Sequence, residues 1–181
     1  HVSDSILVRR GMSRPADADI ISRLGLPCFV KPNAGGSSFG VTKVKTAEQL
    51  APAIDKAMQE SDEVMIERLL TGTEITCGCF RRLDGTPCTF PITEVVVKDV
   101  EFFDYEAKYE GKSDEITPAR IAPQTAERVG ALTRSIYNLL GCYGIIRIDY
   151  ILSGEAGNEQ INLLEINTTP GMTPASFIPQ Q

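Results

Sequence analysis

Two apolar stretches late in the sequence carry polar residues whose types and spacing suit chemistry. The first stretch holds Arg147 and Asp149, the second holds Glu165 and Asn167, and a turn of Ser, Gly and Asn at 153–158 separates them. Side chains alternate along a β-strand, so each polar pair lies on one face of its strand. Antiparallel pairing of the two strands would therefore bring one cation, two carboxylates and one amide onto a common surface. The alternative is a half-exposed hairpin whose polar face meets water.

Electrostatics relates this surface to a nucleotide. Asp149, Glu165 and Asn167 form the kind of oxygen-rich set that Mg²⁺ binds. A carboxylate and a phosphate about 4 Å apart repel by about 4 kcal/mol at an effective dielectric constant of about 20, so these acids could face a phosphate only through a metal ion. Arg147 would then lie beside the reacting oxygens, and the backbone N–H of Gly171 could stabilise an oxyanion.

A glycine- and serine-rich tip lies between two strand-like runs early in the sequence. Residues 27–32 include Lys31, residues 33–40 read Asn-Ala-Gly-Gly-Ser-Ser-Phe-Gly, and residues 41–44 return as a strand. Glycine permits close approach to a ligand, so such a tip can cover phosphates, and a lysine at the strand end adds a point charge. The tip is neither a Walker A loop nor a GxGxxG loop. By itself it is better explained as a flexible hairpin.

Two further segments have possible functions. Glu67 and Glu74 flank an apolar link between predicted strands, where a carboxylate could bind ribose and the link could hold adenine; the alternative is a pair of surface glutamates. Residues 98–116 mix aromatic and charged residues without a steady period, and we expect an ordered lid because long irregular loops in compact domains are usually functional or disordered. A helix is predicted over 123–140, and a loop is predicted beyond Met172, over 173–179. The apolar positions of that helix are Val129, Leu132, Ile136, Leu139 and Leu140.

Composition narrows the class of protein. The chain has 181 residues, of which 42% are hydrophobic, and a net charge of −6, so nucleic acid is not expected as a partner. No apolar run approaches the roughly 20 residues needed to span a bilayer, so no membrane partner is expected either. The lone histidine, His1, excludes histidine catalysis. Five cysteines without a CxxC pair are interpreted as buried, reduced thiols of a cytoplasmic protein.

Five motifs taken together make the sequence resemble the D-alanine–D-alanine ligases of the ATP-grasp superfamily, from about Leu24 to Ile178. In order, these motifs are LPCFVKPNAGGSSFGV, VMIERLLTGTEIT, FFDYEAKY, GIIRIDY and LLEINTTPGMTPASF. The resemblance implies an α+β, ATP-grasp fold in which two α+β lobes with mainly antiparallel sheets enclose a nucleotide cleft. The smaller lobe is expected at residues 1–70 and the larger at 71–181.

The resemblance also implies a set of ATP-binding residues. Lys31 would contact the α- and β-phosphates, Lys108 of the lid would reach the γ-phosphate, and Glu74 would bind the ribose. The glycine tip would cover the β- and γ-phosphates, and the link before residue 71 would hold adenine. The full set implied is Lys31, Gly36, Ser37, Ser38, Glu67, Arg68, Leu70, Glu74 and Lys108.

Metal and reaction chemistry are implied for the late strands. Asp149, Glu165 and Asn167 would bind two Mg²⁺ ions, with Mn²⁺ as a possible substitute. Arg147 and the Gly171 N–H would stabilise the acyl-phosphate and the tetrahedral intermediate.

The implied reaction starts when ATP phosphorylates the carboxylate of a first D-alanine, and the amine of a second D-alanine then displaces phosphate. Ser176 and Phe177 would hold the carboxylate of the second D-alanine, while Ser38 and Tyr109 would help to close the lid. The intact EAKY motif containing Tyr109 favours a dipeptide over D-alanyl-D-lactate. A lid suits this route because an acyl-phosphate hydrolyses in contact with water.

Members of the resembled family have an amino-terminal domain that binds the first D-alanine, and its residues have no match here. We therefore expect a monomeric fragment, inactive alone, from a cytoplasmic enzyme of peptidoglycan synthesis that dimerises at full length. Two alternatives stay open. One is another ATP-grasp carboxylate–amine ligase or a D-alanyl-D-lactate ligase, and the other is a nucleotide-binding or interaction module without catalysis.

Overall fold

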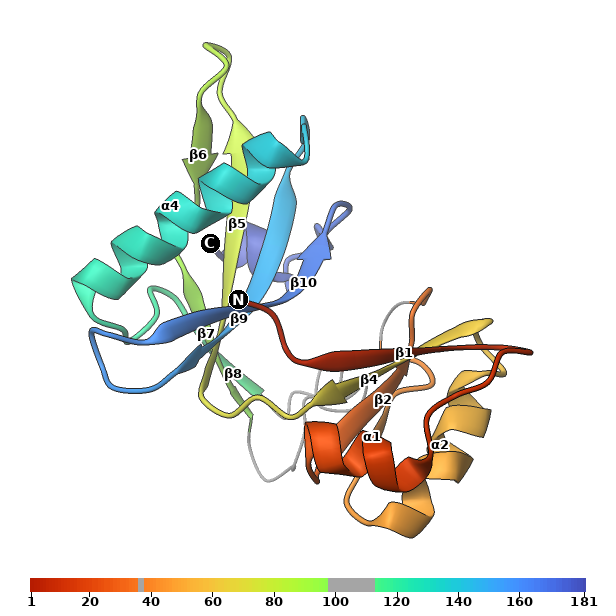
Figure 1. Cartoon of the computed structure of the whole chain (residues 1–181). Helices are drawn as coiled ribbons and strands as arrows, with labels where there is room; N and C mark the ends of the chain where they lie inside the picture. Colours follow the sequence, from red (N-terminus) through yellow and green to blue (C-terminus); the bar gives the residue numbers. More distant parts are fainter. Residues whose placement is uncertain (36–37, 98–112) are drawn as a thin grey trace. The chain divides into compact units, whose positions relative to one another are not determined.

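The computed structural model describes residues 1–35, 38–97 and 113–181 (Figure 1). The chain divides into two compact units. Unit 2 contains the described residues of Ser3–Leu70, and unit 1 contains residues 1–2, 71–97 and 113–181. Both units combine helices with antiparallel sheets, so the predicted α+β class is confirmed.

Unit 2 is built on a four-stranded sheet in the order β1-β4-β2-β3. Its strands are β1 (Ser5–Arg9), β2 (Cys28–Pro32), β3 (Thr42–Val44) and β4 (Glu63–Arg68). All three pairings are antiparallel. The strands expected on either side of the glycine tip are β2 and β3, and they pair directly.

Helices α1 (Asp17–Leu24) and α2 (Leu50–Ala57) supply the rest of the unit 2 core. A single 3₁₀ turn, η1 (Ala47–Gln49), precedes α2, and Thr46 with Gln49 forms a capping box. Leu50 and Ile54 of α2 are buried in one core with Val30 and Ile66 of the sheet. The opposite face of the sheet carries Lys31 and Glu67, which are partly buried.

Unit 1 is built on a six-stranded antiparallel sheet with the order β10-β9-β5-β7-β8, with β6 paired to β5. Its strands are β5 (Thr73–Arg81), β6 (Pro87–Thr89), β7 (Thr93–Val97), β8 (Ser113–Ile116), β9 (Ile146–Ser153) and β10 (Gln160–Asn167). The predicted hairpin is therefore present as β9 and β10. Of the predicted lid, residues 98–112 lie outside the described residues, and the remainder forms β8.

Helix α4 (Pro123–Leu139) covers one face of this sheet (Figure 1). The buried face of α4 differs from the predicted stripe: Leu139 is 85% exposed and Leu140 is 53% exposed. Val129 of that stripe is buried as predicted, and Leu132 and Ile136 are partly buried against the core. The other buried residues of α4 are Thr125, Gly130, Thr133 and Tyr137. Small and hydroxyl-bearing residues let the helix approach the sheet, and the Thr133 hydroxyl hydrogen-bonds that of Tyr150 at 2.8 Å.

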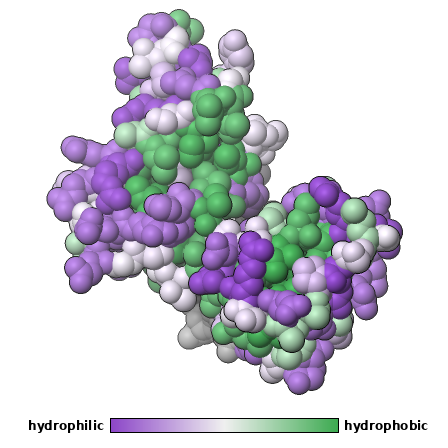
Figure 2. All heavy atoms as spheres, viewed as in Figure 1, coloured by the Kyte–Doolittle hydropathy of each residue, from purple (hydrophilic) through white to green (hydrophobic). Residues whose placement is uncertain are grey.

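The face of unit 1 that carries α4 is apolar. Ile148 and Tyr150 of β9 are fully buried there, whereas Leu163 and Ile166 of β10 are only partly buried. Figure 2 shows hydrophobic residues gathered beside α4 in this view. The polar residues of β9 and β10 occupy the other face.

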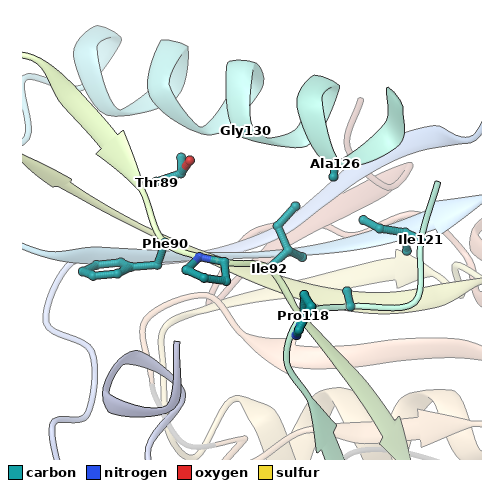
Figure 3. Close-up of a pocket in the computed structure, with 9 residues that line it drawn as sticks. Thr89, Phe90, Ile92, Pro118, Ile121, Ala126 and Gly130 are labelled. Atoms are coloured by element: carbon teal, nitrogen blue, oxygen red, sulfur yellow. The ribbon is translucent and has the colours of Figure 1, made fainter. Parts of the chain in front are cut away.

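A short helix, α5 (Phe177–Gln180), replaces the loop that the sequence predicts after Met172. It packs against the face of the sheet opposite α4, with Phe177 and Ile178 each 7% exposed (Figures 1 and 3). Residues 177–181 read Phe-Ile-Pro-Gln-Gln, which is too short a segment to show a helical period. Packing on the sheet decides its conformation.

The cysteines only partly match the sequence interpretation. All five are free thiols, and Cys28, Cys77 and Cys79 are buried, but Cys88 and Cys142 are partly exposed. Burial raises the pKa of Cys77 to about 12 and that of Cys79 to about 11, so both stay protonated near neutral pH.

No helix in the described part of the chain is long and apolar enough to cross a bilayer.

The ion pair between Glu94 and Arg120 gives a test of the unit 1 fold. Glu94 is 8% exposed, and it accepts hydrogen bonds from Nε of Arg120 at 2.9 Å and from Nη2 at 2.6 Å. These guanidinium bonds outweigh the effect of burial and lower the pKa of Glu94. The contribution of this ion pair to the free energy of unfolding is therefore fully present above the unfolded-state pKa of Glu94, which is about 4.3. It is lost as the pH falls through the lower folded-state pKa.

Replacing Arg120 by methionine should lower the free energy of unfolding at pH 7 by about 1–3 kcal/mol, because a buried carboxylate loses its partner. Urea denaturation followed by circular dichroism measures this. The difference from the parent protein should narrow as the pH falls below about 4. Arg23→Met, at an exposed position of α1, is the matched control. A difference that stays constant between pH 7 and pH 3 would contradict the assignment.

Candidate functional site

The register of β9 and β10 joins the two polar pairs on one face of unit 1. Glu165 lies opposite Asp149, and Asn167 lies opposite Arg147. On the other side of β9, Thr76 of β5 lies opposite Asp149. Four chemically active side chains from two strands thus share a surface, which we call the polar face.

A β-bulge at Leu164 makes this arrangement possible. Leu163 pairs with Tyr150 and Glu165 pairs with Asp149, so the register shifts between Leu163 and Glu165. Without the shift, Glu165 would lie on the same side as Leu163, which packs on the apolar core. An extra residue in one strand re-aims the side chains that follow it. The bulge therefore delivers Glu165 and Asn167 to the polar face.

Arg147 and Asp149 form a bidentate ion pair at the centre of the polar face. Nε of Arg147 donates to Oδ1 of Asp149 at 2.8 Å, and Nη2 donates to Oδ2 at 2.8 Å. The amide nitrogen of Asn167 donates to the same Oδ2 at 3.1 Å. Only 8% of the Arg147 side chain and 14% of the Asp149 side chain are exposed. Both charges are therefore held in place by direct partners.

The guanidinium of Arg147 also packs on the ring of Phe177, with its central carbon 5.0 Å from the ring centre. Burial disfavours the charge, but the hydrogen bonds and charge of Asp149, together with the charges of Glu165 and Glu74, raise the pKa of Arg147. The side chain is therefore a permanent cation held between a carboxylate and an aromatic ring.

Two residues of this face, Glu115 and Thr76, were not predicted from the sequence. Burial raises the pKa of Glu115 on β8, against the opposing effects of a hydrogen bond from Gln180 and the charge of Arg147. Thr76 is 1% exposed, and its hydroxyl has no hydrogen-bond partner among the residues that the structure describes. No local motif marks these positions, because strand pairing alone brings them beside Arg147.

The loop that follows β10 is shaped by contacts among its own residues. Ser176 N donates to the Thr173 carbonyl at 2.8 Å, and the two hydroxyls lie 2.9 Å apart. A Cβ at Gly171 would lie 2.6 Å from Oγ of Ser176, so this close approach favours glycine. Gly171 and Ser176, both predicted as site residues, are therefore neighbours in space.

The donor set of the polar face is compatible with a hard cation. Within the described ranges, no cluster of three His, Cys, Asp or Glu side chains is arranged to hold a metal. The candidate set here consists of two carboxylates and one amide oxygen, from Asp149, Glu165 and Asn167, and it contains only the hard oxygen ligands that Mg²⁺ prefers. Glu165 is exposed and can reorient, whereas Asp149 is fixed by Arg147.

Other predicted nucleotide-binding residues lie in unit 2. Nζ of Lys31 on β2 forms an ion pair at 2.6 Å with Oε2 of Glu67 on β4, on the sheet face opposite the helices. Arg68 is exposed and donates to the carbonyl of Arg23 at 2.8 Å. Leu70, at the end of unit 2, is partly buried.

The described part of the glycine tip has unusual backbone geometry. Ser38 has a φ of 57°, which is uncommon for a residue other than glycine, and a Cβ at Gly40 would lie 2.8 Å from Cγ of Pro32. Gly36, Ser37, Lys108 and Tyr109 lie outside the described residues. Glu74 belongs to β5 of unit 1, on the same face as Thr76.

A pocket of about 380 Å³ in unit 1 lies away from these residues (Figure 3). Phe90 and Ile92 line it from the link between β6 and β7, Pro118 and Ile121 from the loop before α4, and Ala126 from α4. The lining contains none of the predicted site residues. The polar face is therefore not part of this pocket.

Comparison with known proteins gives a consistent result. A family model described as D-ala D-ala ligase C-terminus matches residues 4–181. A D-alanine–D-alanine ligase of Phocaeicola vulgatus is 62% identical over 180 residues, which cover 99% of this chain and 54% of that protein. One from Bacteroides fragilis is 58% identical with the same coverage. The chain spans about half the length of the curated relatives it matches.

Solved structures are similar as well. A VanG D-Ala:D-Ser ligase from Enterococcus faecalis superposes with a TM-score of 0.81 at 32% identity, covering 98% of this chain and 50% of that one. A D-alanine–D-alanine ligase from Bacillus anthracis gives 0.78 at 32% identity, covering 99% and 55%. Its complex with ATP gives 0.76 at 28% identity, covering 99% and 53%. The ATP-grasp fold is thereby confirmed.

Replacing Asp149 by asparagine should lower the free energy of unfolding by about 1–3 kcal/mol in metal-free buffer, because the buried Arg147 loses its charged partner. Urea denaturation is the measurement, and Asp55→Asn on the exposed side of α2 is the matched control. Equal stability of Asp149→Asn and the parent would show that the ion pair is not what holds Arg147.

Proposed function

Because the chain belongs to the D-ala D-ala ligase C-terminus family, we propose that it is the ATP- and metal-binding part of an enzyme that joins two D-alanines. The product would be the dipeptide used in peptidoglycan precursor synthesis. The enzyme would be the longer protein that the length of the curated relatives suggests, and the chain alone would bind ATP without appreciable ligation.

The arrangement of Arg147, Asp149, Glu165 and Asn167 on the polar face is the observation that supports this proposal. A fixed cation beside hard oxygen donors suits a reaction in which negative charge passes between phosphate and carboxylate oxygens. A hairpin whose polar face merely meets water would not bury 92% of an arginine side chain behind a bidentate ion pair. The interpretation as a plain surface hairpin is therefore less well supported.

The proposed reaction has two steps. A carboxylate oxygen of the first D-alanine attacks the γ-phosphorus of ATP, which forms an acyl-phosphate and releases ADP. The amine of the second D-alanine then attacks the acyl carbon and loses a proton, and the phosphate departs with the electrons of the C–O bond. Both steps place negative charge on oxygens that the cation of Arg147 would stabilise.

Each residue of the polar face has a role in the proposal. Asp149, Glu165 and Asn167 would hold two Mg²⁺ ions, which supply charge neutralisation for phosphates when bound. Arg147 would donate hydrogen bonds to the reacting oxygens, and the Gly171 N–H would bind the oxyanion of the tetrahedral intermediate.

The residues of the loop after β10 would bind the second substrate. Ser176 and Phe177 would hold the carboxylate of the second D-alanine. The contact between Ser176 and Thr173 supports this role, because it fixes the hydroxyl of Ser176 within the loop.

Unit 2 would supply most of the residues that contact the nucleotide. Lys31 would exchange its partner Glu67 for the α- and β-phosphates, while the tip with Gly36, Ser37 and Ser38 would cover the β- and γ-phosphates. The link formed by Glu67, Arg68 and Leu70 would hold adenine, with Glu74 on the ribose. Lys108 and Tyr109 would act from the lid. In this proposal residues 1–70 and 71–181 form two lobes that enclose one nucleotide.

Three properties of the whole protein complete the proposal. The reaction would take place in the cytoplasm, where ATP is available. The full-length enzyme would be a homodimer, and the chain by itself would be a monomer. Mn²⁺ would replace Mg²⁺ with retention of activity, because it accepts similar oxygen ligands.

A second candidate is a ligase that accepts a different second substrate. The VanG D-Ala:D-Ser ligase, with a TM-score of 0.81, is as similar in structure as the D-alanine–D-alanine ligases compared above. Comparing D-alanine, D-serine and D-lactate as acceptors in the full-length enzyme, with phosphate release as the readout, separates these activities.

Replacing Glu165 by glutamine in the full-length enzyme should lower kcat by about a hundredfold and raise the Mg²⁺ concentration needed for half-maximal activity, because a charged ligand is lost. Phosphate release with D-alanine and ATP measures both effects. The matched control is Glu155→Gln in the exposed turn between β9 and β10. Unchanged turnover would exclude a catalytic metal at this position.

The 181-residue chain by itself should bind Mg·ATP but form no detectable dipeptide. Isothermal titration calorimetry measures the binding, and chromatography of a D-alanine reaction mixture measures the product. Lys31→Met should weaken binding by about tenfold, because a charge-assisted contact to phosphate is worth about 1.5–3 kcal/mol. Lys56→Met, at an exposed position of α2, is the control. Efficient dipeptide formation by the chain would contradict the proposal that the chain alone binds ATP without appreciable ligation.

A further inference from the structure

Gly78 lies at the point of β5 that faces Arg147. The two residues are register partners across β5 and β9, so the backbone at 78 borders the polar face. A Cβ at this position would lie 2.6 Å from Cδ1 of Ile178, 2.7 Å from Oε1 of Gln181 and 2.7 Å from a ring carbon of Phe90. A side chain at 78 would therefore displace the segment 177–181 from the sheet.

The carboxamide of Gln181 bonds to the sheet at the same point. Gly78 N donates to Oε1 of Gln181 at 3.0 Å. Nε2 of Gln181 donates to the Thr76 carbonyl at 3.1 Å and to the Thr93 hydroxyl at 3.2 Å. One side chain thus satisfies a backbone donor and a backbone acceptor of β5.

This contact replaces part of the β-ladder. The pairing of β5 with β7 ends at Thr76 and Thr93, so the two strands no longer pair at Gly78. Buried backbone groups need hydrogen-bond partners, and a primary amide reproduces the donor and acceptor of a peptide group. Gln181 therefore occupies the gap as a substitute for a strand neighbour.

Docking of this segment places Phe177 against Arg147. Phe177 is 7% exposed, and its ring lies on the guanidinium face at 5.0 Å. Asp149 accepts hydrogen bonds from the edge of the same guanidinium, through Nε and Nη2. Two contacts therefore set the orientation of Arg147. Asp149 lies on the same strand, β9, whereas Phe177 belongs to α5.

We propose that Gly78 and Gln181 are positioning residues for the ligation: they dock the segment 177–181 on the sheet so that Phe177 orients the Arg147 guanidinium toward the reacting oxygens. Neither residue touches the reacting atoms. The catalytic consequence rests on the proposed function, whereas the docking itself rests on the contacts above. A misplacement of a catalytic group by about 1 Å is enough to lower turnover strongly.

Gln181→Met tests the dock because it keeps the length of the side chain but removes all three of its hydrogen bonds. In the ¹⁵N-labelled 181-residue chain, the Nε–Hε signal of Arg147 should shift and broaden, since the ring of Phe177 no longer stays over it. The signal is assigned by its loss in Arg147→Lys. Gly78→Ala should shift the same signal. Gly144→Ala, where an added Cβ meets nothing within 4 Å, should leave it unchanged.

In the full-length enzyme, Gln181→Met should lower kcat by about tenfold and leave KM for ATP within about twofold of the parent value. In an Arg147→Lys background the same change should have no further effect on kcat, because both substitutions act through one guanidinium. An additive loss in the double variant would overturn the proposal, as would an unchanged Arg147 signal in Gln181→Met. Absence of dipeptide from the unsubstituted enzyme would contradict the proposed function alone, since the NMR result decides the dock independently.

Discussion

The ion pair between Arg147 and Asp149 is the interaction around which the polar face of unit 1 is built. Two opposite charges are almost fully removed from water and joined by two hydrogen bonds of 2.8 Å. Burial of either charge alone would be costly, so each depends on the other and on the side chains that surround them. Asn167 adds a hydrogen bond to the carboxylate, and Phe177 packs on the guanidinium. A pair fixed in this way can present charge to a ligand without reorganising, which is what stabilisation of developing charge requires.

The same sheet must also bury an apolar core, and the two demands are met by opposite faces. Ile148 and Tyr150 alternate with Arg147 and Asp149 along β9, so α4 covers one side while the other stays polar. Regular alternation fails in β10, where Leu163 is needed in the core and Glu165 on the polar face. The bulge at Leu164 resolves this conflict by inserting one residue between them. Core packing and site chemistry are therefore reconciled by a local irregularity rather than by a change of strand.

Family membership, the ATP-grasp fold and the polar face support one another. The family model covers residues 4–181, and the solved ligases superpose over nearly the whole chain. The residues proposed to act on substrate are divided between the two units: Lys31 and the glycine tip belong to unit 2, whereas Arg147 and its partners belong to unit 1. Such a division suits a reaction that needs both a bound nucleotide and exclusion of water from a reactive intermediate.

Much of this protein could be predicted from the sequence because its signals are local. Alternation of polar and apolar residues indicated the strands that became β9 and β10, and the motifs identified the family. Only the tertiary structure decided which faces are buried and which residues meet. The exposed Leu139 and Leu140 fit the helical pattern, yet α4 instead turns Thr133 and Tyr137 toward the sheet, because contact with the strands sets its rotation. Phe177 and Gln181 carry no local signal for their contacts, since Arg147 and Gly78 lie far away in the sequence and only packing brings them together.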